Sequence, residues 1–413
     1  FFLEDSGIYQ FADLNENLLI PYYTRRVGLS QSGEPVPILA AGKLSGRAGA
    51  YELGATTAWL DEADGVDSTG VFAGRLTRQL FGDSTAGIIA TAGDPRSNGD
   101  NALAGCDFRF QTTELPNRET LVTNLFCLGS QTDPIDDPEF SGHAFGMGAA
   151  WPGDRISLSA QAAEISEGFD PALGFLRRND IRYLSGKIQY LFRPDNPAWW
   201  QSYGVSYTGN VYTNLDNEIE SRSHAIYPFI LKFASNDELS FGIIDSLDRT
   251  DFEFTLPGDV PVPAGNYDML SYDVVYTLSD NRPLSGAIGA GWGDYYGGDW
   301  ASAYANLWWI PTSLTAFGVD YIYEQYDMPG GFVDSQTVSV WITLRFTPRM
   351  RWANLIQYDT ISETIGFNSR FSWEFQEGRR FDLVLNQLFA DQETGYRLTD
   401  TELVAKVGLQ LRF

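Results

Sequence analysis

The sequence holds few residues that could act as a catalytic base. Acyl-transfer enzymes generally activate a nucleophile through a nearby histidine, and the chain has only His143 and His224. His224 shares strand parity with Arg222 and Lys232, which indicates a polar face, and His143 follows Gly142 near the predicted end of a strand. Carboxylates are too numerous to single out a glycosidase pair, and no glycine-rich phosphate motif precedes a helix. We therefore expect no enzymatic activity.

An acidic stretch, "DEADGVDSTG", offers the oxygen ligands that calcium prefers. Asp61, Asp64 and Asp67 lie within seven residues, and Gly65 permits a sharp turn. The spacing differs from that of an EF-hand loop, so two interpretations stay open: a Ca²⁺ site or a solvated acidic loop. The same two interpretations stay open for residues 133–139, where Asp133, Asp136, Asp137 and Glu139 lie close in the sequence. Divalent cations at such loops could also bridge the protein to anionic lipid headgroups.

Two cysteines flank a short predicted connection, residues 113–118. If the turn is centred near Pro116, Cys106 and Cys127 fall at about the same height on neighbouring strands. A pair of this kind can form a disulfide in an oxidising envelope compartment. The alternative is two free thiols that face lipid.

The elements that carry these residues are predicted to be strands along almost the whole chain. In "SQTVSVWITLRF", Val338, Val340 and Ile342 share one parity, whereas Ser339 and Thr343 share the other. This alternation is typical of a strand with one apolar and one polar face. No apolar run of about 18 residues could form a membrane-spanning helix. The predicted strands number about 22 and occupy 18–29, 37–47, 50–60, 70–80, 85–94, 101–112, 119–130, 139–151, 155–165, 180–193, 201–214, 220–234, 238–254, 267–278, 283–294, 300–311, 314–326, 334–346, 350–359, 364–375, 380–390 and 402–413.

Connections between these strands differ in length from one end to the other. If 18–29 runs outward, one set is long and acidic, as in 61–69, 131–138 and 166–179, whereas the other is mostly short, as in 48–49 and 152–154. Long outer loops and short inner turns are characteristic of outer-membrane barrels. Five tryptophans near the short turns would form an interfacial girdle: Trp151, Trp199, Trp200, Trp308 and Trp309.

The predicted fold class is therefore all-β, a transmembrane antiparallel outer-membrane β-barrel of about 22 strands. It spans 18–413 and follows a periplasmic or lumenal lead-in segment, 1–17, with both chain ends on the periplasmic side. The formal charge of −26 argues against a nucleic-acid partner. We expect the bacterial outer membrane of a Gram-negative cell, with outer-membrane lipid and, through the terminal Phe413, the barrel assembly machinery as partners.

Strand parity predicts a mixed and fairly basic lumen in this acidic chain. The interior of a barrel with about 22 strands is too wide for wall side chains to fill, so it holds water, a plug or a partner. Two functions follow: a porin-like channel or translocation pore for polar solutes or polymers, or a non-conducting scaffold for a surface or envelope assembly. The predicted pore-lining residues are Lys43, Arg47, Arg75, Arg109, Lys187, Arg222, Asp320, Glu324, Arg345, Arg370, Glu374, Lys406 and Arg412.

Several stretches resemble one bacterial family. They are "FFLEDSGIYQF", "YYTRRVG", "PILAAGKLSGRAGAYELGATTAW", "GRLTRQLFGDSTAGIIAT", "NALAGCDFRF" and "FNSRFSWEFQEGRRFDLVLNQ". The chain is similar here to the barrel portion of outer-membrane proteins of unassigned function that carry an N-terminal carbohydrate-binding-module-family-nine-like domain. The resemblance implies an outer-membrane barrel whose partner is a domain of that kind or another envelope protein.

Overall fold

The computed structural model describes residues 6–12, 18–115, 119–135, 137–392 and 395–409. Strands dominate these residues, and the described helices are two 3₁₀ turns, η1 (Ser6–Tyr9) and η2 (Thr24–Arg26). None of the described helices is long and apolar enough to cross a membrane.

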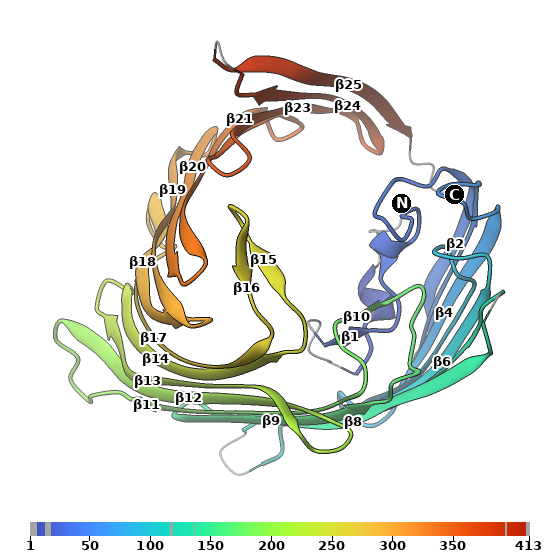
Figure 1. The fold of residues 1–413 in the computed structure, drawn as a ribbon, viewed down its shortest axis with the longest axis horizontal. Helices are drawn as coiled ribbons and strands as arrows, with labels where there is room; N and C mark the ends of the chain where they lie inside the picture. The colour runs from blue at the N-terminus through green and yellow to red at the C-terminus, as the bar shows by residue number, and fades with distance from the viewer. Residues whose placement is uncertain (1–5, 13–17, 116–118, 136, 393–394, 410–413) are drawn as a thin grey trace. The chain divides into compact units, whose positions relative to one another are not determined.

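Within the described residues, twenty-one strands form one antiparallel β-barrel (Figure 1). Consecutive strands pair with each other, as expected when short turns join antiparallel neighbours. The barrel strands are β2 (Ile38–Ala48), β3 (Tyr51–Leu60), β4 (Thr69–Gln79), β5 (Thr85–Ala92), β6 (Asp100–Thr112), β7 (Leu121–Asp133), β8 (Phe140–Pro152), β9 (Ile156–Ile165), β11 (Ile181–Phe192), β12 (Trp200–Asn214), β13 (Ile219–Phe233), β14 (Glu238–Thr250), β17 (Gly265–Leu278), β18 (Leu284–Tyr295), β19 (Gly298–Thr312), β20 (Thr315–Met328), β21 (Gly331–Thr347), β22 (Met350–Asp359), β23 (Thr364–Gln376), β24 (Arg379–Ala390) and β25 (Arg397–Leu409).

Two short strand pairs stand outside the barrel sheet. β1 (Leu19–Ile20) pairs with β10 (Phe175–Leu176), and β15 (Phe254–Leu256) pairs with β16 (Val260–Val262). The second strand of β1–β10 and both strands of β15–β16 lie in long connections between barrel strands. We call the ends of the strands that carry these connections the long-loop end, and the opposite ends the short-turn end.

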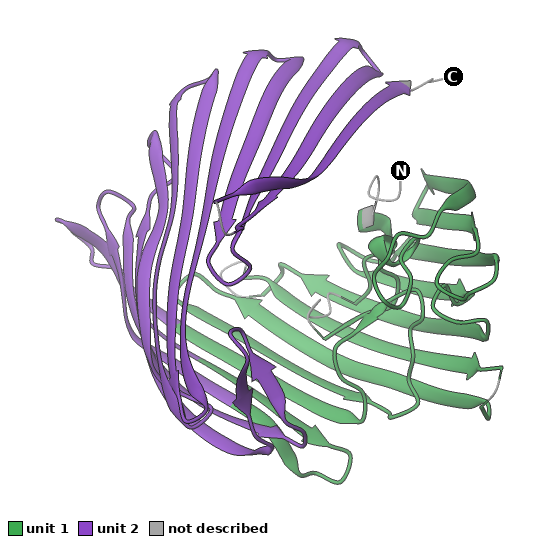
Figure 2. Ribbon diagram, turned by 45° about the horizontal axis from the view of Figure 1, so that its top comes forward, with its two compact units in different colours: residues 1–189, 208–222 green, residues 190–207, 223–413 purple. Residues whose placement is uncertain are grey.

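The chain divides into two compact units, which Figure 2 distinguishes by colour. Unit 1 comprises residues 1–189 and 208–222, and unit 2 comprises 190–207 and 223–413. Each unit has its own apolar cluster. In unit 1, wall residues such as Ile89, Leu103 and Phe126 pack with the N-terminal segment. In unit 2, Val262 of the β15–β16 hairpin packs with Met328 and other residues near the long-loop end.

The prediction of a barrel is confirmed, but the predicted strand 18–29 is wrong. The barrel begins at Ile38, so it has 21 described strands rather than an even number near 22. Leu18, Leu19, Tyr22 and Val27 are all buried, with exposed fractions of 7% or less. These apolar residues occupy both parities, so the segment has no polar face. It therefore packs as a covered peptide rather than as a half-solvated barrel strand.

The N-terminal segment packs on the face of unit 1 that carries Thr56 and Asp107, and its periplasmic or lumenal location stays a prediction. The Tyr9 hydroxyl lies 2.5 Å from the Thr56 hydroxyl on β3, and the Ala12 amide donates to Asp107 on β6 at 3.0 Å. Ile38 pairs with Leu60, which ends β3 just before a long loop. The chain therefore enters its first barrel strand from the long-loop end, not from the short-turn side as predicted. Phe413 lies outside the described residues.

Candidate functional site on the inner faces of the barrel

The register of unit 1 brings five predicted pore-lining residues to one face. Lys43 is the cross-strand partner of Thr56, and Arg75 is the partner of Gly54, so both share a face with the buried Tyr9 contact. The other members of this face are Arg47, Arg109 and Lys187. The register therefore places these residues on one face of the sheet, because strand side chains alternate strictly, while their role in lining a pore stays a prediction.

The register of unit 2 brings six further predicted pore-lining residues to one face of the sheet. Asp320 pairs with Ser339, Ser372 pairs with Asp382, and Asp382 pairs with Lys406. The predicted residues on this shared face are Asp320, Glu324, Arg345, Arg370, Glu374 and Lys406. Arg222 lies on β13, and Arg412 lies outside the described residues.

The opposite face of unit 2 is apolar. Val340 pairs with Ile356, and Ile356 pairs with Phe367. Ile356 is 41% exposed and Trp373 is 42% exposed, although water would penalise both. An apolar outer band and a polar inner face are the pattern of a wall between lipid and water. At the short-turn end, Trp199 and Trp309 are also exposed, as expected of a girdle. Trp308, predicted for the same girdle, lies instead on the inner face, where it packs against Trp341.

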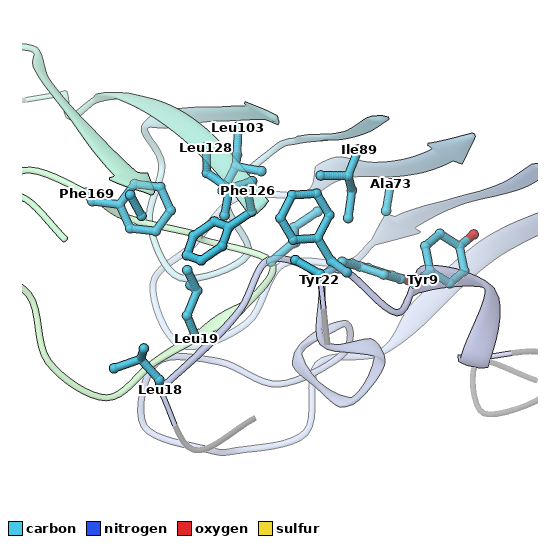
Figure 3. Close-up of a cluster of buried hydrophobic side chains, with 14 of the residues drawn as sticks. Tyr9, Leu18, Leu19, Tyr22, Ala73, Ile89, Leu103, Phe126, Leu128 and Phe169 are labelled. Atoms are coloured by element: carbon cyan, nitrogen blue, oxygen red, sulfur yellow. The ribbon is translucent and has the colours of Figure 1, made fainter. Parts of the chain in front are cut away.

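One predicted pore-lining residue, Arg75, is buried instead of lining open space. Its side chain is 3% exposed and forms a bidentate ion pair with Asp107, at 2.6 and 2.8 Å. The guanidinium carbon lies 5.0 Å from the centre of the Phe11 ring. Figure 3 shows part of the apolar cluster around this contact, with Tyr9 and Phe126 among its members. Arg75 therefore anchors the N-terminal segment, a role that parity could not reveal because its ring partner comes from a distant part of the chain.

The inner face of unit 2 carries arginines at its short-turn end. Arg345 on β21 and Arg351 on β22 are direct cross-strand partners. Like charges placed directly opposite each other destabilise a sheet. Neither side chain forms an ion pair with a described carboxylate, whereas Arg380 pairs with Asp382 at 2.7 Å. A cavity of about 700 Å³ lies here, lined by Arg345, Arg349, Arg351, Glu374 and Arg380 among others.

The acidic loop does not gather a metal site. Asp64 accepts a hydrogen bond from the Ser32 hydroxyl at 2.6 Å, while Asp61 accepts one from the Glu62 amide at 3.0 Å. Among the described residues, no group of three or more His, Cys, Asp or Glu side chains is arranged to hold a metal ion. The predicted set of Asp61, Asp64 and Asp67 is therefore not brought together, because nearby donors engage its members separately. Calcium binding at 133–139 stays a prediction, since Asp136 lies outside the described residues.

Cys106 and Cys127 are direct cross-strand partners, as their predicted height requires. Their sulfur atoms lie 2.9 Å apart, and both are free thiols on an exposed face. The structure holds the two sulfur atoms close, and the choice between a disulfide and two free thiols stays a prediction.

Comparison with known proteins identifies a similar fold but no family. No protein-family model matches the sequence, and no curated protein matches it. Among solved structures, the siderophore receptor PirA from Acinetobacter baumannii is similar, with a TM-score of 0.53 and 9% sequence identity. The match covers 86% of this chain and 73% of that receptor. At this identity the similarity concerns the fold alone: this chain is a transmembrane antiparallel β-barrel of the outer-membrane type.

Proposed function

We propose that this protein resides in the bacterial outer membrane and lets polar solutes pass, with anions favoured over cations. The observation that carries this proposal is the opposed pair Arg345 and Arg351 on the inner face of unit 2. The chain has 54 acidic and 28 basic residues, so carboxylates that could neutralise these two arginines are abundant. Arginines left without such partners on a water-facing wall attract anions and tune the selectivity of a pore.

A second candidate is a non-conducting barrel that anchors an envelope assembly. The observation in its favour is the cover on the inner face of unit 1. There the N-terminal segment is held by the buried Arg75–Asp107 pair and by the Tyr9–Thr56 contact. A barrel whose interior is filled by its own chain or by a partner would keep the same wall but carry no current.

Single-channel recording in planar lipid bilayers distinguishes the two candidates. The purified full chain is added to one side, and current is recorded at fixed voltage in symmetric salt. Stepwise conductance increments are expected for the channel. Insertion without any conductance step, with insertion verified by protease protection in vesicles of the same lipid, would reject the channel in favour of the anchor.

A further inference from the structure

A second arginine-rich cavity lies in unit 1, at the long-loop end. Its volume is about 590 Å³, and its walls come from the segment around η2 and from the long connection between β9 and β11. Five arginines line it: Arg25, Arg26, Arg96, Arg177 and Arg178. Lining carboxylates are fewer, namely Glu167 and Asp170. The pore proposed above depends on Arg345 and Arg351 of unit 2 and does not involve these five arginines.

Backbone pairing fixes the walls of the cavity. Leu19 pairs with Leu176 in the β1–β10 ladder, and the Tyr23 amide donates to the Leu173 carbonyl at 2.8 Å. A Cβ atom on Gly174 would lie 2.2 Å from the Ile20 carbonyl oxygen, so only glycine permits this approach. Leu18, Leu19 and Phe169, which Figure 3 labels, are buried members of the apolar cluster of unit 1, and Phe169 also lines the cavity. The arginines therefore stand on a well-packed base.

Two of the five arginines already have protein partners. Arg96 binds Asp94 through Nε at 2.9 Å and Asp170 through an Nη atom at 2.6 Å. Arg178 donates to the Ser221 hydroxyl at 2.8 Å and lies over the Tyr212 ring. These contacts are part of the frame of the cavity.

The other three arginines form no ion pair with a described carboxylate. They are Arg25, Arg26 and Arg177. Burial, and then the neighbouring charge of Arg96, lowers the pKa of the Arg26 guanidinium. A cation held at a half-buried position beside another cation is stabilised when an anion binds next to it. Asp94 and Asp170 act against this lowering, but the arginines that line the cavity outnumber its lining carboxylates. The excess positive charge therefore has the sign and the position to recruit an anion.

The remaining lining narrows the ligand class. Tyr23, Phe140 and Phe175 contribute aromatic surface to the same cavity. Guanidinium groups form paired, charge-assisted hydrogen bonds to phosphate oxygens, while ligand pockets commonly combine apolar walls with a few convergent polar groups. We propose that this cavity binds a soluble phosphate monoester, with the phosphate on Arg26 and Arg177 and its organic part, such as a sugar ring, against the aromatic side chains. This binding does not require the barrel to conduct.

Calorimetric titration of the full chain in detergent micelles tests the proposal. Glucose 6-phosphate is the probe, and glucose is the neutral control. We expect saturable binding of glucose 6-phosphate, none of glucose, and at least tenfold weaker binding in the double variant Arg26→Gln/Arg177→Gln. Arg155→Gln is the control variant, because it removes charge from an exposed residue in the β8–β9 turn. It should bind like the parent.

Three outcomes would overturn the proposal. The first is no binding by the parent chain, and the second is equal affinity in the parent and the double variant. The third is a chain that binds phosphatidylglycerol in mixed micelles but does not bind glucose 6-phosphate. That result would assign the arginines to a lipid headgroup instead. Circular dichroism of each variant verifies the strand content, and Arg26→Lys, which keeps the charge, should retain part of the affinity.

Discussion

The buried pair of Arg75 and Asp107 gives the sharpest prediction about stability. Asp107→Asn changes one atom of the side chain and removes its charge. Arg75, with a side chain only 3% exposed, then keeps a positive charge without a carboxylate. Breaking a buried ion pair by removing one partner costs about 3–5 kcal/mol. Asparagine can still accept one hydrogen bond, so we expect a loss of about 3 kcal/mol in the free energy of unfolding.

Guanidinium chloride unfolding of the barrel in lipid vesicles, followed by tryptophan fluorescence, measures this loss. Asp83→Asn is the matched control, because Asp83 is exposed in the β4–β5 turn, where surface changes stay within about 0.5 kcal/mol. The double variant Arg75→Met/Asp107→Leu removes both charges and should be more stable than Asp107→Asn alone. Residues 6–12 should also become more accessible to protease in Asp107→Asn, since the Ala12 amide bonds to this carboxylate.

Equal unfolding midpoints for Asp107→Asn and Asp83→Asn would refute this reasoning. They would mean that water or another group compensates Arg75, and that the pair does not hold the N-terminal segment against the wall.

Three further predictions concern facing, pH and redox state. Leu403→Arg on the apolar face of β25 should cost about 2–4 kcal/mol at the bilayer midplane, whereas Val404→Arg on the inner face should cost much less; similar unfolding curves for the two would contradict the facing. Burial alone would raise the pKa of Asp237, but hydrogen bonds from the Ser279 amide and from Ser235, Arg282 and Tyr276 lower it to about 2. Because this value lies below the unfolded value of about 3.9, the carboxylate stabilises the fold above about pH 4 and loses that effect as the pH falls through about 2. Urea unfolding should therefore show less acid sensitivity in Asp237→Asn than in the parent, and equal sensitivity would contradict the assignment. A mild oxidant should join Cys106 to Cys127 within one chain, since their sulfur atoms lie 2.9 Å apart; mass spectrometry that finds two free thiols after treatment would count against the register.

Strand alternation predicted most of the barrel because one lipid-facing and one water-facing side leave a direct mark on the sequence. Parity predicts opposite faces for Val340 and Arg345, and their cross-strand partners are Ile356 and Arg351. Parity failed at Leu18, Leu19 and Tyr22, where apolar residues resemble a strand but are buried on all sides. Propensity cannot distinguish a peptide that packs on a wall from a strand within it.

The two arginine clusters were harder to predict than the barrel. The cavity in unit 1 joins Arg26 to Arg177, which are far apart in the sequence and meet only through the β1–β10 ladder. The signal for it was the pair of basic dipeptides, Arg25–Arg26 and Arg177–Arg178, in an acidic chain. The Arg345–Arg351 pair depends on the register across one turn, which parity alone leaves open by a residue or more.

The reversal potential across a salt gradient tests the central claim, that the barrel passes polar solutes with a preference for anions. We predict a potential that favours anions for the parent chain and a shift toward cations in Arg345→Gln/Arg351→Gln. The shift should shrink as salt rises, because exposed charges are screened over about 10 Å at 0.1 M. A barrel that inserts but never conducts, or a reversal potential that the double variant leaves unchanged, would contradict the account.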